Sequence, residues 1–137
     1  MDILPHWEQG TPGVLCVAGP HAIPVSTAVR GSDSRLVFAL GGGRETLARL
    51  REDPRAAFCL LGAGSAFTAY GRAAVVREQL EGAPNVVAVA LEVERVQDHL
   101  AGSRTEVLDG ARWRWTAEEA RADERRIVAE LRELAAQ

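Results

Sequence analysis

The residues best suited to hold a ligand are three consecutive glycines, Gly41, Gly42 and Gly43, with Arg44 directly after them. Glycine has no side chain, so a ligand can approach the backbone of this turn closely. A short helix is predicted to follow, and it directs its unpaired N–H groups and the positive end of its dipole at the same place. Arg44 adds a planar set of donors that matches phosphate or carboxylate. The turn therefore predicts an anion site.

One neighbour argues against this chemistry. Glu45 places a carboxylate in the first turn of the predicted helix, where it already complements the dipole and repels an anion. The plainer interpretation is that the glycines only connect a strand to a helix. Both interpretations remain open at this stage.

The other chemically active residue types form no recognisable constellation. His21 and His99 are far apart and have no carboxylates at a telling spacing, so we expect both in turns or at the surface and predict no metal site or catalytic triad. Cys16 and Cys59 stand inside apolar stretches, which predicts that both are small buried hydrophobic residues. All 16 basic residues are arginine, which excludes a Schiff-base mechanism because that needs a lysine amine.

The composition predicts one globular domain spanning residues 1–137. At 137 residues and 47% hydrophobic, the chain can bury a sizeable core without disulfides or metals. A net charge of −3 and the absence of basic clusters argue against nucleic acid as a partner. No apolar stretch reaches the length of a membrane span, and no leader pattern opens the sequence, so we expect a cytoplasmic protein without membrane contact.

The elements that would position the glycine turn are mostly strands. A helical turn is expected over residues 4–9, the short helix ends at Asp53-Pro54, and residues 21–30 and 35–40 are expected to pair as an antiparallel hairpin. Gly71 interrupts one long strand and predicts a bulge or a close backbone approach. The predicted strands cover residues 14–18, 21–30, 35–40, 55–61, 65–77 and 86–96.

The C-terminal part is predicted to hold a hairpin and a helix. Asp109-Gly110 is the dipeptide preferred in two-residue hairpin turns, so residues 105–108 and 111–115 are expected to pair. Thr116 and Glu119 have the spacing of a capping box at the start of the last helix. The order of strands, one short helix, more strands and a final helix favours an antiparallel barrel.

Four stretches in this order resemble the FMN-binding split-barrel superfamily of the pyridoxamine 5′-phosphate oxidase type. They are HAIPVSTAV, RLVFALGGGRETLARLREDPRAAFCLL, FTAYGRAAVV and VVAVALEVERV, which together cover roughly residues 14–96. A subgroup of short members also resembles this chain in the helix motif and in an aromatic-Arg-Trp near the C-terminus. The resemblance implies a mainly β (α+β) fold, a six-stranded antiparallel split β-barrel with short helices and a C-terminal helix. It also implies a homodimer with two cofactor sites at the interface.

The function implied by the resemblance is that of an FMN-binding oxidoreductase, which exchanges hydride between its flavin and a small substrate. A deazaflavin is the related cofactor to consider, and no metal is implied. The alternative is a non-catalytic dimer that binds flavin weakly or not at all, or that binds another flat anionic ligand. Catalytic residues are not indicated. The cofactor-binding residues predicted here are Ser26, Thr27, Gly41, Gly42, Gly43, Arg44, Thr46 and Trp115.

This chain departs from the better-known members at the cofactor positions. Thr27 stands where they usually have Arg, and Ala66 where they have Gln. Arg44, Glu45 and Thr46 replace a Ser-Arg-Lys sequence, so Arg44 alone restores a cation. Each lost charge-assisted hydrogen bond costs about 1.5 to 3 kcal/mol, which predicts weakened FMN binding.

Overall fold

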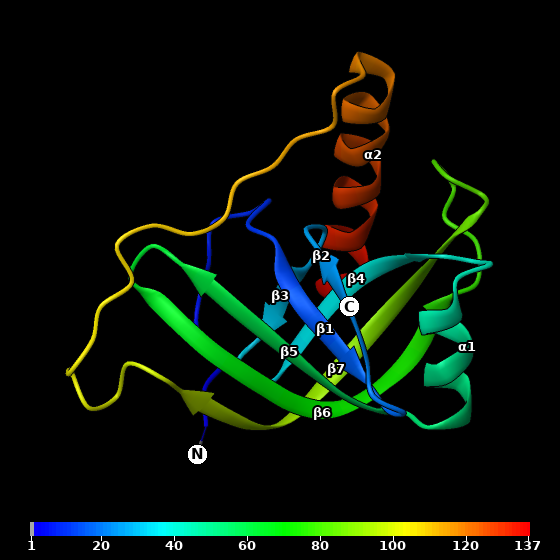
Figure 1. Cartoon of the computed structure of the whole chain (residues 1–137). Coiled ribbons are helices and arrows are strands. Elements are labelled where there is room, and N and C mark those ends of the chain that lie inside the picture. The colour runs from blue at the N-terminus through cyan, green and yellow to red at the C-terminus, as the bar shows by residue number, and fades with distance from the viewer. Residues whose placement is uncertain (1) are drawn as a thin grey trace.

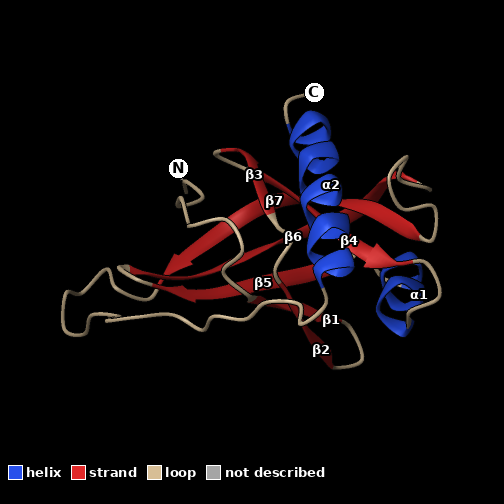
Figure 2. Ribbon diagram, turned by 90° about the horizontal axis from the view of Figure 1, so that it is seen from above, coloured by secondary structure: helices blue, strands red, loops and turns tan. Residues whose placement is uncertain are grey.

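The computed structural model describes residues 2–137 as one antiparallel sheet with two helices (Figure 1). The sheet curves strongly, and the two helices lie outside it (Figure 2). The strands are β1 (Gly13–Val17), β2 (His21–Val25), β3 (Val29–Ser32), β4 (Arg35–Gly41), β5 (Arg55–Gly62), β6 (Ser65–Arg77) and β7 (Val86–Asp98). The helices are α1 (Glu45–Glu52) and α2 (Glu118–Ala135).

The sheet has the order β2-β1-β5-β6-β7-β4-β3. Its two edge strands, β2 and β3, are consecutive in the chain and only residues 26–28 separate them. A sheet whose opposite edges are joined by so short a connection has to curl until the edges come close. The result is a barrel that stays open along one seam, at residues 26–28.

The sheet has seven strands where six were predicted, because the stretch 21–30 is divided. Residues 26–28 leave the ladder, and other contacts satisfy their polar groups. The Trp7 Nε1–H group donates to the Ala28 carbonyl at 3.3 Å, and Thr27 Oγ1 accepts the backbone N–H of Ala39 at 3.1 Å. The predicted hairpin is therefore half right: β3 pairs with β4, whereas β2 pairs with β1.

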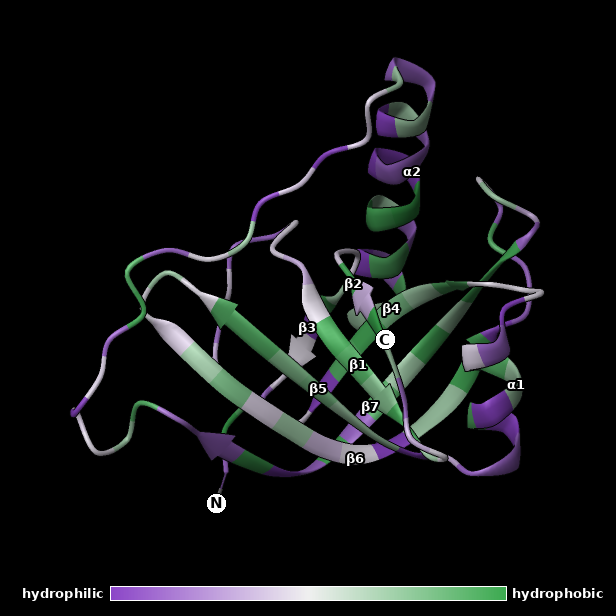
Figure 3. Cartoon of the chain, in the orientation of Figure 1, coloured by the Kyte–Doolittle hydropathy of each residue, from purple (hydrophilic) through white to green (hydrophobic). Residues whose placement is uncertain are grey.

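The main core fills the inside of the curled sheet. Phe38, Phe58 and Phe67 are fully buried there, and the ring of Trp7 lies against the last two. A second apolar cluster lies on the outer face of β3, β4 and β7, where Leu131 and Leu134 of α2 cover it. Figure 3 shows why α2 can do this: apolar residues gather toward the sheet-facing end of the helix, and its far end is hydrophilic.

The local predictions around α1 and β6 are confirmed. α1 ends at Glu52, directly before Asp53-Pro54, and Leu47 and Leu50 bury its apolar stripe. The register between β6 and β7 shifts between Tyr70 and Gly71, which is the predicted bulge.

Three predictions for the terminal segments are wrong. Residues 4–9 form no helical turn, because Trp7 is drawn into the core instead. Residues 105–115 form no hairpin: the Val107 carbonyl accepts the backbone N–H of Gly64 at 3.1 Å, and Gly110 packs against the backbone at the end of β5. The capping box is absent, because the helix begins one residue later than it requires and its N-cap is Ala117, which makes no side-chain cap bond.

Neither helix in residues 2–137 combines the length and the apolar composition needed to cross a membrane.

Candidate functional site

The glycine turn joins β4 to α1 and leaves part of its backbone free. The Gly42 N–H donates to the Asn85 carbonyl at 2.8 Å, and the Arg44 N–H donates to the Gly41 carbonyl at 3.2 Å. Across residues 2–137, no hydrogen bond engages the N–H groups of Gly43 or Glu45. A Cβ at Gly43 would meet no atom within 4 Å, so the space beside it is open. The turn thus presents free donors to solvent at the helix start.

Arg44 is the residue that precedes α1, and its side chain is exposed. Among the described residues it forms no ion pair and no side-chain hydrogen bond, so its guanidinium is free to meet an anion. Glu45 is turned toward other partners: its Oε2 lies 3.1 Å from Arg49 Nε and 3.0 Å from His21 Nδ1. The carboxylate that was expected to oppose an anion is therefore partly compensated by its neighbours.

His21 has a carboxylate partner, which corrects the sequence-based expectation that it has none. Its Nδ1 faces Glu45, and its Nε2 lies 2.9 Å from Thr46 Oγ1. The contacts fasten the start of β2 to the first turn of α1. Thr46 is 1% exposed, so its hydroxyl is not accessible as a nucleophile and serves to hold this corner together.

A cavity of about 410 Å³ opens on one side of the glycine turn. Its lining includes Gly42, Gly43, Arg51 and Asn85. Arg51 donates to both carboxylate oxygens of Glu78, at 3.0 and 2.8 Å, and this hydrogen bonding holds the pKa of Glu78 below its usual value. The sequence did not predict a role for Arg51 of α1 or for Asn85 in the β6–β7 connection, because their spacing does not indicate that they lie beside the glycine turn.

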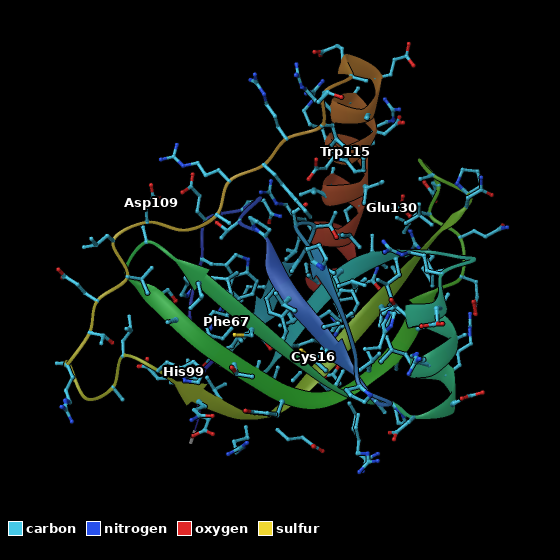
Figure 4. The ribbon with its side chains drawn as sticks, viewed as in Figure 1. Cys16, Phe67, His99, Asp109, Trp115 and Glu130 are labelled. Carbon is cyan, nitrogen blue, oxygen red and sulfur yellow. The ribbon has the colours of Figure 1, made fainter. Side chains whose placement is uncertain are left out.

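The remaining predicted cofactor residues lie elsewhere in the chain. The Ser26 hydroxyl donates to Glu124 of α2 at 3.4 Å, and Thr27 accepts from Ala39 as described above. Trp115 lies beside α2 (Figure 4), in a groove that it does not share with the glycine turn. Within one chain the structure thus brings Gly41 to Thr46 together and leaves Trp115 apart. Their roles toward a cofactor stay predictions.

Cys16 is exposed, which corrects the prediction that both cysteines are buried; Cys59 is half-buried. Alternate residues of β1 face the core, and Leu15 and Val17 hold those positions, so Cys16 points outward. Partial burial and then the neighbouring Cys59 raise the pKa of the Cys16 thiol, which makes it a poor nucleophile.

Clusters of three or more His, Cys, Asp or Glu side chains that could hold a metal do not occur in the part of the chain described by the structure. His99 is engaged by the Thr68 hydroxyl, with 2.8 Å between Nε2 and Oγ1. Ala66, at the position of the expected glutamine, is 4% exposed and offers no polar group.

No family model and no curated protein matches the sequence, but solved structures match the fold. A protein provisionally assigned as a pyridoxamine 5′-phosphate oxidase from Listeria innocua is similar with a TM-score of 0.55 and 19% identity, over 66% of this chain and 90% of that one. A second such protein, from Lactobacillus delbrueckii, gives 0.58 and 17%, over 71% and 95%. An F420 reductase gives 0.57 and 12%, over 66% and 91%.

A heme binding protein from Mycobacterium smegmatis is also similar, with a TM-score of 0.52 and 18% identity, over 66% of this chain and 49% of that one. At such identities the likeness concerns the fold and says nothing of the ligand. The expected fold is confirmed: the chain has the split-barrel fold of the pyridoxamine 5′-phosphate oxidase-like proteins.

Proposed function

We propose that this chain binds a phosphorylated flavin-type cofactor, FMN or a deazaflavin, and exchanges hydride with a small substrate as an oxidoreductase. One observation carries the proposal: the turn from Gly41 to Arg44 combines free N–H groups, open space and an unpaired guanidinium at the start of a helix. These features fit a phosphate group. We choose a flavin-type cofactor among phosphate-bearing ligands because an F420 reductase is one of the proteins with this fold.

A bound flavin supplies the hydride chemistry itself. The residues of this chain then have the simpler tasks of binding and orienting. In the proposal, Gly43, Arg44 and the Glu45 N–H hold the phosphate. The ion pair between Arg51 and Glu78 keeps one wall of the neighbouring cavity in place. The hydroxyl hydrogen of Thr27 is available to a ligand, since its oxygen acts as acceptor toward Ala39.

Arg44→Ala is expected to weaken FMN by about 1.5 to 3 kcal/mol, the worth of a charge-assisted hydrogen bond, and riboflavin hardly at all. Riboflavin lacks the phosphate, so it is the matched control ligand. Fluorescence titration of both ligands measures the difference. The melting temperature of the unliganded variant should stay unchanged, because an exposed arginine contributes little to folding. Equal losses for the two ligands would place the phosphate elsewhere.

The second candidate function is a split-barrel protein without flavin chemistry. The hydroxyls of Ser26 and Thr46 favour it, because both are already bonded to Glu124 and His21. Wild-type protein that is colourless when purified and binds neither FMN, riboflavin nor deazaflavin would decide for this candidate.

We further propose that the active form is a homodimer with its ligand at the interface. Exposed apolar side chains on the outer face of the sheet and in the segment after β7 support this, among them Val14, Leu61 and Leu108. Light scattering should give twice the mass of one chain, 14.7 kDa. A monomer at micromolar concentration would refute the dimer.

A further inference from the structure

A groove separate from the glycine turn runs between α2 and the segment before it. Its volume is about 570 Å³, within the range of about 300 to 1,000 Å³ typical of small-molecule sites, and it is open to solvent. Trp113 and Trp115 line one side, and Val128 and Ala129 of α2 line the other. Both indole side chains remain about half exposed, at 52% and 56%. The two exposed rings and the apolar side chains of Val128 and Ala129 line the same groove, so a flat apolar body has apolar surface to contact there.

The groove wall is fixed in place by a tie between the two segments. Arg121 Nε donates to the Trp115 carbonyl at 2.8 Å, and its Nη1 lies 3.3 Å from Glu118. Glu124, on the same helix, accepts from Ser26 at 3.4 Å and thereby links the groove to the barrel seam. Hydrogen bonds thus connect α2 both to the segment before it and to residues 26–28 of the barrel.

Positive charge dominates the lining, although the protein carries a net charge of −3. Four arginines line the groove and Glu124 is the one acidic residue among the lining residues. Arg121 and Arg125 share Glu118, the latter at 3.7 Å. Arg114 and Arg132 form no ion pair with any residue in 2–137. An anionic ligand would therefore complement the positive charge of this lining.

We propose that this groove binds a planar aromatic carboxylate, with its ring against Trp113 and Trp115 and its carboxylate toward Arg114 and Arg132. Aromatic faces stack well on indole, and guanidinium groups pair with carboxylates in a planar fork. The inference goes beyond the proposed function. It requires neither a phosphate at the glycine turn nor a second subunit.

The test uses 2-naphthoate as the probe and the ¹⁵N–¹H correlation spectrum of the full chain as the readout. The protein has three tryptophans and hence three indole N–H signals. We expect 2-naphthoate to shift the signals of Trp113 and Trp115 and to leave Trp7, whose N–H is bonded to Ala28, in place. 2-Naphthalenemethanol and 2-naphthylmethylammonium have the same ring without the negative charge and should bind at least roughly tenfold more weakly.

Arg132→Gln should weaken 2-naphthoate roughly tenfold, whereas Arg104→Gln should not. Arg104 is the matched control because it is exposed and lies outside the groove lining. Equal binding of the three probes, equal effects of the two variants, or a shift confined to Trp7 would each overturn the proposal.

The groove and the flavin site can fail separately. Arg44→Ala should leave 2-naphthoate binding unchanged. If the wild type binds no flavin, the proposed function is refuted, but the proposed binding of 2-naphthoate in the groove is not. If FMN instead displaces 2-naphthoate, and Arg132→Gln rather than Arg44→Ala weakens FMN, the groove is supported as an anion site and the phosphate position at the turn is refuted.

Discussion

Gly71→Ala is expected to destabilise the protein by about 3 kcal/mol or more, the upper range for overpacking in a core. The bulge brings the backbone of β7 against Gly71, and an added Cβ would overlap the Glu92 carbonyl oxygen and lie 2.8 Å from its carbon. Backbone atoms inside a paired sheet cannot move aside as a flexible side chain can. Since small domains have about 5 to 15 kcal/mol in total, much of the stability would be lost. Urea unfolding measures the change.

Gly102→Ala is the matched control for this substitution. The nearest atom to a Cβ at Gly102 is Arg104 Cγ at 3.8 Å, which is an ordinary van der Waals contact with a side chain. Its unfolding midpoint should stay close to that of the wild type. If Gly71→Ala unfolds at the same urea concentration as Gly102→Ala, the β6–β7 bulge does not hold the backbones as closely as described.

Glu130→Ala is expected to cost about 2 to 4 kcal/mol, because it leaves several donors without an acceptor. Glu130 of α2 is 8% exposed, and Figure 4 labels its position beside the helix. It accepts from Arg77 Nη1 at 2.9 Å and from the backbone N–H groups of Glu81 and Gly82 at 3.0 and 3.3 Å. One carboxylate thus joins α2, the end of β6 and the β6–β7 connection. The partial exposure of Arg77 keeps the loss below that of a fully buried pair.

The pH dependence of stability follows from the same contacts. Burial raises the pKa of Glu130, but hydrogen bonds from Glu81, Arg77 and Gly82 outweigh it and leave the pKa below the ordinary 4.5. A lowered folded-state pKa means that the stabilisation is complete above pH 4.5 and is lost as the pH falls through the lowered value. The stability difference between wild type and Glu130→Ala should therefore shrink in acid.

Glu133→Ala is the control on the same helix, because Glu133 is exposed and has no ion pair within the described residues. Its free energy of unfolding should differ from that of the wild type by less than about 0.5 kcal/mol. A Glu130→Ala variant as stable as Glu133→Ala at pH 7 would contradict the role given to Glu130.

The parts of the fold that sequence alone predicted are those with local causes. Asp53-Pro54 ends α1 because the residue before a proline avoids helical geometry. Gly71 marks the bulge because only glycine fits there. The division of β2 from β3 has remote causes, namely Trp7 reaching Ala28 and Thr27 reaching Ala39. Asp109-Gly110 failed as a hairpin because contacts with the β5–β6 turn outweigh its turn preference.

The candidate site divides in the same way. The glycine turn and Arg44 are contiguous, so their meeting was predictable. Only the fold brings His21 to Glu45 and Thr46, and the spacing of these residues in the sequence does not predict the contacts. The buried position of Glu130 could have been predicted, because its helical spacing places it on the apolar stripe of α2 with Ile127 and Leu134. A carboxylate on such a stripe implies a buried partner that hydrogen-bonds to it.

The strand order has a consequence for the order of events in folding. β1 pairs with β5 and β4 pairs with β7, so two of the ladders join segments remote in the chain. Contacts between remote segments slow folding, because a long loop must close before they form. During synthesis the edge of β4 that pairs with β7 stays unpaired until β7 has left the ribosome. Stalled chains that end before Val86 should therefore be prone to aggregation, whereas chains that lack only α2 already contain every strand of the main core.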